Sequence, residues 1–279
     1  MDSNNVEYSF EKELRNRFRE YYKKLPATKT KSTIHKLFQK LKKSNLDFYL
    51  FGGFPKDIYL KKNKAIPRDI DLVTLQSDFK TIFEEFKDYK ITKSRFGGVK
   101  IKFEGIDVDI WPLEKTWAFE SGSVNLNDIN SLSETTFLNI ESIAIELFPK
   151  SKCRNVIAHG FNQAINDKLL EINLKENPFP ELNIARALYA AKRLEYNFGP
   201  HLIEFISENL KSCDIDDILH IYEKKYGIVE FEKNSYRNYL TQIKISDDFY
   251  HNDLKSFKRS YSKQTNIFDK EPSSTRMKV

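Results

Sequence analysis

The stretch Tyr49–Thr74, YLFGGFPKDIYLKKNKAIPRDIDLVT, holds the pattern that decides the fold. Its first residues belong to the apolar run Phe48–Phe51, which a glycine pair ends, so we predict a short strand followed by a tight turn. Pro55 suits the first turn of a helix, because its missing N–H would have no partner there, and we expect that helix to continue to Leu60. The stretch closes on RDIDLV, where two aspartates alternate with apolar residues.

Asp69 and Asp71 are the two aspartates of RDIDLV. If this segment is a strand, both carboxylates point to one face of the sheet and Ile70 points to the other. Adjacent like charges repel, so the arrangement predicts a divalent cation between them, and Mg²⁺ is typically held by one or two carboxylates together with substrate phosphates. The alternative is an edge strand whose charged face is simply solvated.

A second acidic pair, Asp107 and Asp109, alternates with apolar residues in GIDVDIW. A neighbouring strand carrying this pair would place a third carboxylate, that of Asp109, beside Asp69 and Asp71. Three carboxylates allow two metal ions about 3.5–4 Å apart, the arrangement used in phosphoryl and nucleotidyl transfer. We therefore expect Asp69, Asp71 and Asp109 to be both the metal ligands and the catalytic residues.

The glycine pair itself, Gly52 and Gly53, lies between a predicted strand and a predicted helix. Such a turn brings backbone N–H groups close to a phosphate, and Lys56 would add a positive charge nearby. Asp57 is expected to pair with a neighbouring basic residue rather than to bind metal. The motif GG-x-x-K-D is a weak signal alone, and its spacing to RDIDLV makes it specific.

The remaining periodicity predicts an α+β protein: a small head with a mixed sheet and N-terminal helices, followed by an all-helical body. Two amphipathic helices precede Tyr49, and Ser77 is the predicted cap of a helix that reaches Phe86. Strands are predicted around Ile91 and over 99–103 and 106–111. Helical periodicity covers 137–147, 184–194, 202–210 and 215–226. We divide the chain into N-terminal helices (1–46), head (47–150), helical body (151–255) and a basic, frayed tail (256–279).

The charge of the chain is concentrated at its ends. Residues 1–45 carry 12 basic and 5 acidic side chains, residues 46–249 carry 27 and 32, and residues 250–279 carry 7 and 3. Basic arms suit a polyanion such as RNA, although a solvated surface explains them equally well. No apolar run is long enough to span a membrane and no secretory leader is evident, so we expect a cytoplasmic protein.

Together, FGGFPKD, RDIDLV, RFGGVKI and DVDIW resemble the head domain of the polymerase-beta-like nucleotidyltransferases, among them the class II CCA-adding enzymes and bacterial poly(A) polymerases. TTFLNIESIAIEL and RALYAAKRLEY are similar to two further segments of that family, so the resemblance covers roughly residues 47–197. It implies an NTP as substrate, Mg²⁺ or Mn²⁺ as cofactor, and RNA with a tRNA-like 3′ end as acceptor. The nucleotide-binding residues it implies are Gly52, Gly53, Lys56 and Asn139. Arg186 and Arg193 lie seven residues apart on one predicted helix, so they share a face and are expected to approach the nucleotide or the RNA backbone. For Arg186 and Arg193, an ion pair with a residue such as Glu195 is an equally good explanation.

The chain also departs from the family pattern. Glu134, Thr135 and Thr136 stand where the family has two arginines and an aspartate, and the element that reads the base falls on Phe179, Pro180 and Asn183. The loss of these residues opens two alternatives to RNA 3′-end addition. One is a toxin or defence nucleotidyltransferase that modifies tRNA or protein, and the other is a non-catalytic nucleotide- or RNA-binding module of the same fold.

Overall fold

The computed structural model describes residues 3–25, 28–61, 64–94 and 97–245. The predicted tail, residues 256–279, lies outside the described residues. The chain separates into two compact units between Asp167 and Lys168, and each unit is described by itself. No helix of the described residues is long and apolar enough to cross a membrane.

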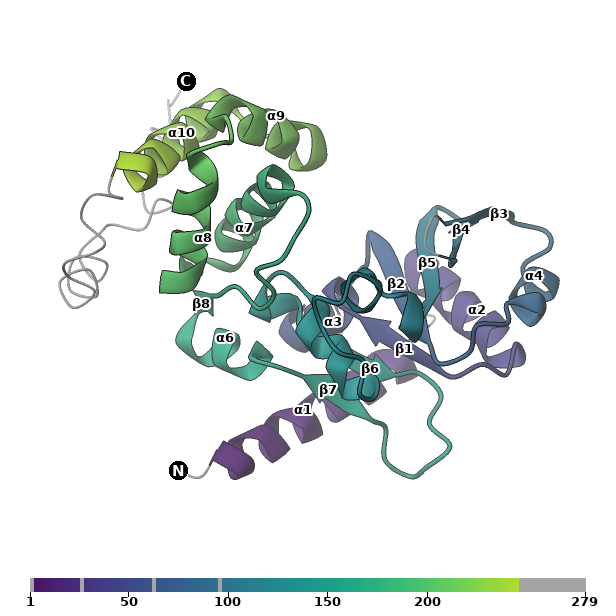
Figure 1. Ribbon diagram of the computed structural model, residues 1–279. Helices are drawn as coiled ribbons and strands as arrows, with labels where there is room; N and C mark the ends of the chain where they lie inside the picture. Colours follow the sequence, from purple (N-terminus) through teal and green to yellow (C-terminus); the bar gives the residue numbers. More distant parts are fainter. Residues whose placement is uncertain (1–2, 26–27, 62–63, 95–96, 246–279) are drawn as a thin grey trace, which may run out of the picture. The chain divides into compact units, whose positions relative to one another are not determined.

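A mixed sheet forms the centre of the first unit (Figure 1). Within the described residues it has seven strands in the order β3-β4-β5-β2-β1-β6-β7. Only the pairing of β2 with β5 is parallel among these strands, and the other neighbours are antiparallel. The strands are β1 (Phe48–Phe51), β2 (Asp69–Thr74), β3 (Lys90–Lys93), β4 (Val99–Phe103), β5 (Ile106–Pro112), β6 (Ile143–Glu146) and β7 (Val156–Ala158). The α+β class with a mixed-sheet head is confirmed.

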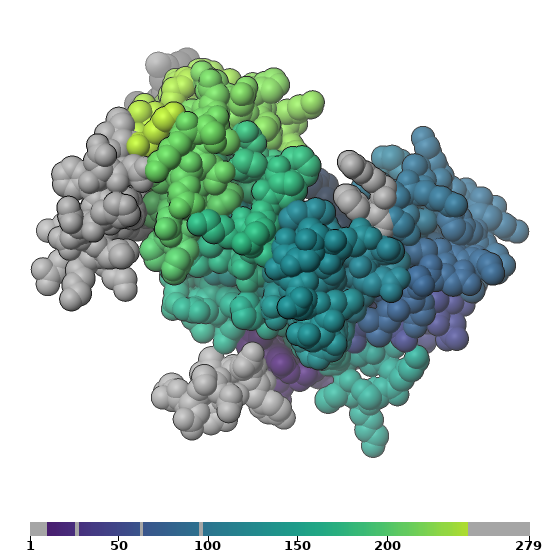
Figure 2. All heavy atoms as spheres, in the orientation of Figure 1, coloured from purple at the N-terminus to yellow at the C-terminus, as the bar shows by residue number. Residues whose placement is uncertain are grey.

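The two faces of this sheet have different coverings. One face carries a cluster of buried side chains: Tyr49, Phe51, Val73, Leu113, Leu132, Ala144 and Ile157. The segment after β5 covers it, with η2 (Leu113–Lys115), α5 (Trp117–Glu120) and η3 (Ile129–Thr135). This segment is the dark teal surface at the centre of Figure 2. The opposite face carries Leu50, Leu72 and Ile110, which are register neighbours and almost fully buried.

Helices pack against the leucine face of the sheet. α3 (Gly53–Lys61) contacts β1, β2 and β6, and α1 (Ser3–Lys23) packs against α3 and β7. α2 (Lys29–Lys43) packs against α4 (Lys80–Glu85) and buries its periodic apolar residues, each worth about 1.5–3 kcal/mol relative to exposure. The N-terminal helices are therefore part of the same unit as the sheet.

Two local predictions are wrong. The segment 137–147 is not a helix, because it forms η4 (Asn139–Glu141) and then β6. Ile143, Ala144 and Ile145 are fully buried between β1 and β7, and a short apolar run buried on both faces suits a strand as well as a helix. Ser77 does not cap α4, whose first turn is instead stabilised by Asp78 Oδ1 accepting the Lys80 N–H at 2.9 Å.

The second unit is mainly helical. Helices α7 (Pro180–Leu194), α8 (Pro200–Leu210) and α9 (Ile215–Tyr226) match the predicted periodic segments, and α10 (Glu230–Ile245) packs on α8 and α9. A parallel pairing of β8 (Leu169–Leu170) with β9 (Asn197–Phe198) adds a small strand element to the predicted helical body. α6 (Phe161–Asp167) ends the first unit.

Gly98 provides a test of how tightly the β4–β5 end of the sheet is packed. A Cβ atom at Gly98 would lie 2.4 Å from the Ile110 carbonyl oxygen and 2.8 Å from Trp111 Cβ. Gly98→Ala should therefore lower the free energy of unfolding by about 1–3 kcal/mol, measured by urea denaturation. Gly53→Ala is the control, since its Cβ would meet nothing within 4 Å, and it should change stability by less than about 0.5 kcal/mol. Equal stability of the two variants would contradict the packing.

Candidate functional site

Four aspartates share one face of the sheet in the N-terminal halves of the two parallel strands, β2 and β5. In the register of β2 with β5, Asp71 lies beside Asp109 and Asp69 lies beside Asp107. Asp71 and Asp109 are half-buried, whereas Asp69 and Asp107 are exposed. Phe51, the register neighbour of Asp71, lies on the same face and belongs to the apolar cluster. The carboxylates therefore lie next to that cluster, toward the first residues of β2. The prediction that a neighbouring strand places Asp109 beside Asp71 is confirmed.

The glycine turn lies at the same edge of the sheet. β1 runs antiparallel to β2, and Phe51 pairs with Asp71, so the residues after Phe51 lie next to the first residues of β2. Gly52 has a φ of +67°, which favours glycine, and its N–H donates to the Ile143 carbonyl at 2.9 Å. A Cβ at either Gly52 or Gly53 would meet nothing within 4 Å. Open space therefore adjoins the start of α3, where the first N–H groups have no partner within the helix.

Lys56 and Asn139 lie close to this turn on elements that contact each other. α3 carries Lys56, η4 carries Asn139, and both residues are only 8% exposed. Lys56 Nζ lies 4.0 Å from Glu141 Oε1, so its charge is partly balanced within the protein. Asp57 is buried and forms an ion pair with Lys61 at 2.9 Å, which confirms its expected structural role.

Basic side chains beside the aspartates were missed by the sequence reasoning. Lys100 Nζ lies 2.9 Å from Asp109 Oδ2, and Lys102 Nζ lies 3.0 Å from Asp107 Oδ1. A signal was present: VKIKF alternates, and a tight turn at Glu104 and Gly105 joins it to IDVDIW, which fixes the cross-strand pairs. Asp69 is in turn paired with Arg68 at 2.8 Å.

Carboxylates of this kind suit a hard cation, because oxygen ligands are those that Mg²⁺ and Mn²⁺ prefer. Within the part of the chain that the structure describes, no group of three or more His, Cys, Asp or Glu residues is arranged to hold a metal ion. The neighbouring pair Asp71 and Asp109 supplies two carboxylates, which is the number Mg²⁺ uses when phosphates complete its shell. The donor set therefore fits a cation that arrives with a phosphorylated substrate.

Arg186 and Arg193 lie on α7 in the second unit. Arg193 is exposed, and its guanidinium carbon lies 5.9 Å from the centre of the Tyr189 ring. Their predicted role in nucleotide binding stays a prediction.

The aspartate register makes a prediction about stability. Like charges directly opposite on neighbouring strands repel, so Asp71→Asn should leave the free energy of unfolding unchanged or raise it by about 0.2–1 kcal/mol in urea denaturation. Asp57→Asn is the matched control, since it removes the charge of a buried carboxylate that is paired with the exposed Lys61, and it should lower stability by about 1–3 kcal/mol. A large loss of stability in Asp71→Asn would show that this carboxylate serves mainly to hold the fold.

Comparison with known proteins gives a structural match without a sequence match. No protein-family model and no curated protein matches the chain. A tRNA-processing enzyme in its apo form is 16% identical, with a TM-score of 0.55 over 81% of this chain and 60% of that one. A tRNA nucleotidyltransferase complexed with a primer tRNA and an incoming ATP analogue is also 16% identical, with a TM-score of 0.55 over 76% and 61% of the two chains.

The CCA-adding enzyme of Thermotoga maritima complexed with tRNA is 18% identical, with a TM-score of 0.56 over 76% of this chain and 52% of that chain. The chain thus spans between about half and three fifths of the length of these proteins. The sequence resemblance is confirmed at the level of the fold: the chain has the fold of the CCA-adding enzymes and tRNA nucleotidyltransferases.

Proposed function

We propose that this protein is a nucleotidyltransferase that moves a nucleoside monophosphate from an NTP to a hydroxyl group, with a tRNA-like RNA 3′ end as the acceptor. The observation that carries the proposal is the register that sets Asp71 beside Asp109, at the sheet edge where the open glycine turn begins α3. The solved structures of this fold include complexes with tRNA and with ATP, which supports the choice of both substrates.

The reaction needs groups that hold the triphosphate and groups that manage charge. The acceptor oxygen attacks the α-phosphorus, the bond from that phosphorus to the bridging oxygen breaks, pyrophosphate leaves, and the hydroxyl proton passes to solvent. Asp69, Asp71 and Asp109 would hold Mg²⁺ or Mn²⁺, which supplies the Lewis acidity for the hydroxyl and for the leaving group. Backbone N–H groups after Gly52 and Gly53 would bind phosphate oxygens.

The proposal includes four further nucleotide-binding residues. Lys56 would act from beneath the glycine turn, where Glu141 already balances part of its charge. Asn139 lies on the segment next to it, and Arg186 and Arg193 would contribute from α7.

A second candidate is a non-catalytic module that binds nucleotide or RNA. The ion pair between Lys100 and Asp109 favours it, because a lysine already neutralises one of the proposed metal ligands. Glu134 and Thr135, in the place of the family's arginines, support it too. A third candidate keeps the chemistry and changes the acceptor to another site on tRNA or to a protein side chain.

Label transfer distinguishes these candidates. The purified chain, incubated with each labelled NTP, Mg²⁺ and total RNA, should transfer label to RNA. Asp71→Asn and Asp109→Asn should each reduce the transfer by about a thousandfold, because the metal's stabilisation of charge is worth several kcal/mol. Asp107→Asn is the matched control on the same strand and should keep most of the activity.

The outcomes separate the three candidates. Label on protein alone would support the changed acceptor. Absence of label from both RNA and protein, with ATP binding that needs no Mg²⁺ in calorimetry, would support the non-catalytic module.

Lys100 should compete with a cation for Asp109. Lys100→Ala removes that ion pair, so it should lower the Mn²⁺ concentration for half-saturation by up to about fivefold, measured by calorimetry in the presence of a non-hydrolysable ATP analogue. Lys102→Ala, two cross-strand pairs further along, is the control and should shift this Mn²⁺ concentration less. Weaker Mn²⁺ binding in Lys100→Ala would instead mean that the lysine helps to hold the phosphates.

A further inference from the structure

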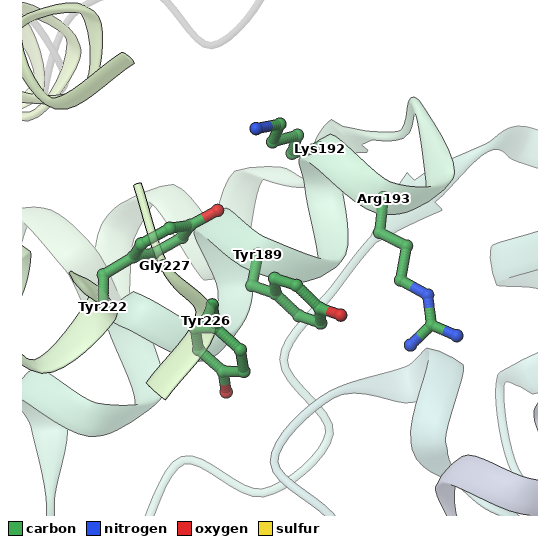
Figure 3. Close-up of a pocket in the computed structure, with 6 residues that line it drawn as sticks. All are labelled: Tyr189, Lys192, Arg193, Tyr222, Tyr226 and Gly227. Carbon is green, nitrogen blue, oxygen red and sulfur yellow. The ribbon is translucent and has the colours of Figure 1, made fainter. Parts of the chain in front are cut away.

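A pocket opens on the second unit between the last turns of α7 and the end of α9 (Figure 3). Its volume is about 270 Å³. It is lined by Tyr189, Lys192, Arg193, Tyr222, Tyr226 and Gly227. The chemistry proposed above uses only Arg193 of this set, so the aromatic part of the pocket needs its own explanation.

The aromatic wall of the pocket is made of tyrosine rings packed on one another. The rings of Tyr189 and Tyr226 stack with centres 4.0 Å apart and planes only 9° from parallel. Tyr222 packs edge-on against Tyr226 with centres 5.3 Å apart. Tyr222 is almost fully buried, and its hydroxyl is 3.3 Å from that of Tyr236 on α10. Burial raises the pKa of the Tyr222 phenol, so the most deeply buried ring of the wall stays neutral.

The upper part of the wall is accessible, which distinguishes it from ordinary core packing. Tyr189 and Tyr226 are only partly buried, in contrast to Tyr222 beneath them. Gly227 ends α9 with a φ of +72°, and a Cβ there would meet nothing within 4 Å. The chain therefore leaves space beside two aromatic rings that another planar group could occupy.

Two consecutive cations flank the tyrosines. Figure 3 shows Lys192 and Arg193 extending from α7 in different directions, with the Tyr189 ring below Lys192 and beside Arg193. Lys192 forms an ion pair with Glu232, which holds it at the rim of the pocket. Arg193 is exposed and lies 5.9 Å from the Tyr189 ring centre, within the range of a cation–π contact. Guanidinium groups bind phosphate through two parallel hydrogen bonds.

A partly exposed aromatic wall with cations at its rim matches what nucleic-acid proteins use for single strands, where bases stack on rings and a basic groove follows the backbone. We infer that this pocket is a subsite for one nucleotide of a single-stranded RNA, with the base against Tyr189 and Tyr226 and a phosphate at Arg193. The inference rests on the proposed function for the role of the strand, but the binding itself is measurable without turnover.

Fluorescence anisotropy of a short labelled single-stranded RNA tests the subsite in the full chain. Tyr189→Leu keeps an apolar side chain but removes the ring, and it should weaken binding about tenfold, whereas Tyr189→Phe should bind like the parent protein. Arg193→Ala should weaken binding and reduce the slope of log K against log salt by about 0.7, as expected for one lost phosphate contact on a single strand.

Arg237→Ala is the matched charge control. Arg237 is a partly exposed arginine of this unit, paired with Asp216 on α9, and its removal should leave the salt slope unchanged. Thermal unfolding monitored by circular dichroism identifies any variant that loses its fold. Arg193 is exposed, so its variant tests the phosphate contact while both tyrosines are kept.

Free ATP distinguishes a strand from a mononucleotide. We expect the parent protein to bind RNA at least tenfold more tightly than ATP. We also expect RNA binding to weaken in both Tyr189→Leu and Arg193→Ala. RNA binding that is unchanged in both variants, or absent from the parent protein, overturns the inference. Label transfer that fails while RNA binding keeps its dependence on Tyr189 and Arg193 would overturn the proposed function and leave the subsite standing.

Discussion

The parallel pairing of β2 with β5 is the constraint on which the rest of the structure depends. It brings two D-x-D segments into register, so that Asp71 lies beside Asp109 on two central strands of the sheet. Like charges on neighbouring strands repel each other and oppose folding. The chain tolerates them because lysines of the neighbouring strand β4 pair with Asp109 and Asp107, and because Asp69 and Asp107 are exposed to solvent. The apolar cluster at the other end of the same face anchors the strands against this repulsion.

The sequence predicted much of this arrangement because alternation and turn chemistry are local signals. The bounds of β4 and the positions of Asp69 and Asp71 on one face follow from the period of two. The segment 137–147 was misassigned because an apolar run buried on both faces has no distinctive period. Which strand pairs with which is a non-local property, so the placement of Asp109 beside Asp71 could only be a hypothesis until the sheet order was known.

The charged partners of the aspartates show a different limit of sequence reasoning. The pairing of Lys100 with Asp109 follows from a tight turn at Glu104 and Gly105, but Glu-Gly is a weaker hairpin signal than Asn-Gly, because glutamate rarely adopts a positive φ. The tyrosine pocket is harder still, because Tyr189 and Tyr226 are far apart in sequence and each lies on an amphipathic helix where an aromatic residue is ordinarily a core residue. Partial exposure decides between the two roles, and only the structure supplies it.

Glu134, Thr135 and Thr136 stand where the sequence resemblance would place two arginines and an aspartate. The threonine hydroxyl groups serve the local backbone: Thr135 Oγ1 donates to the Leu132 carbonyl at 2.7 Å, and Thr136 Oγ1 donates to the Leu138 carbonyl at 3.0 Å. These side chains fix η3 over the apolar face of the sheet and add no positive charge toward a triphosphate. A phosphate bound at this edge therefore needs its countercharge from another element. On the sheet itself, Lys100 and Lys102 of β4 are both paired with aspartates of this face, and Lys100 neutralises Asp109, the neighbour of Asp71, in the absence of substrate.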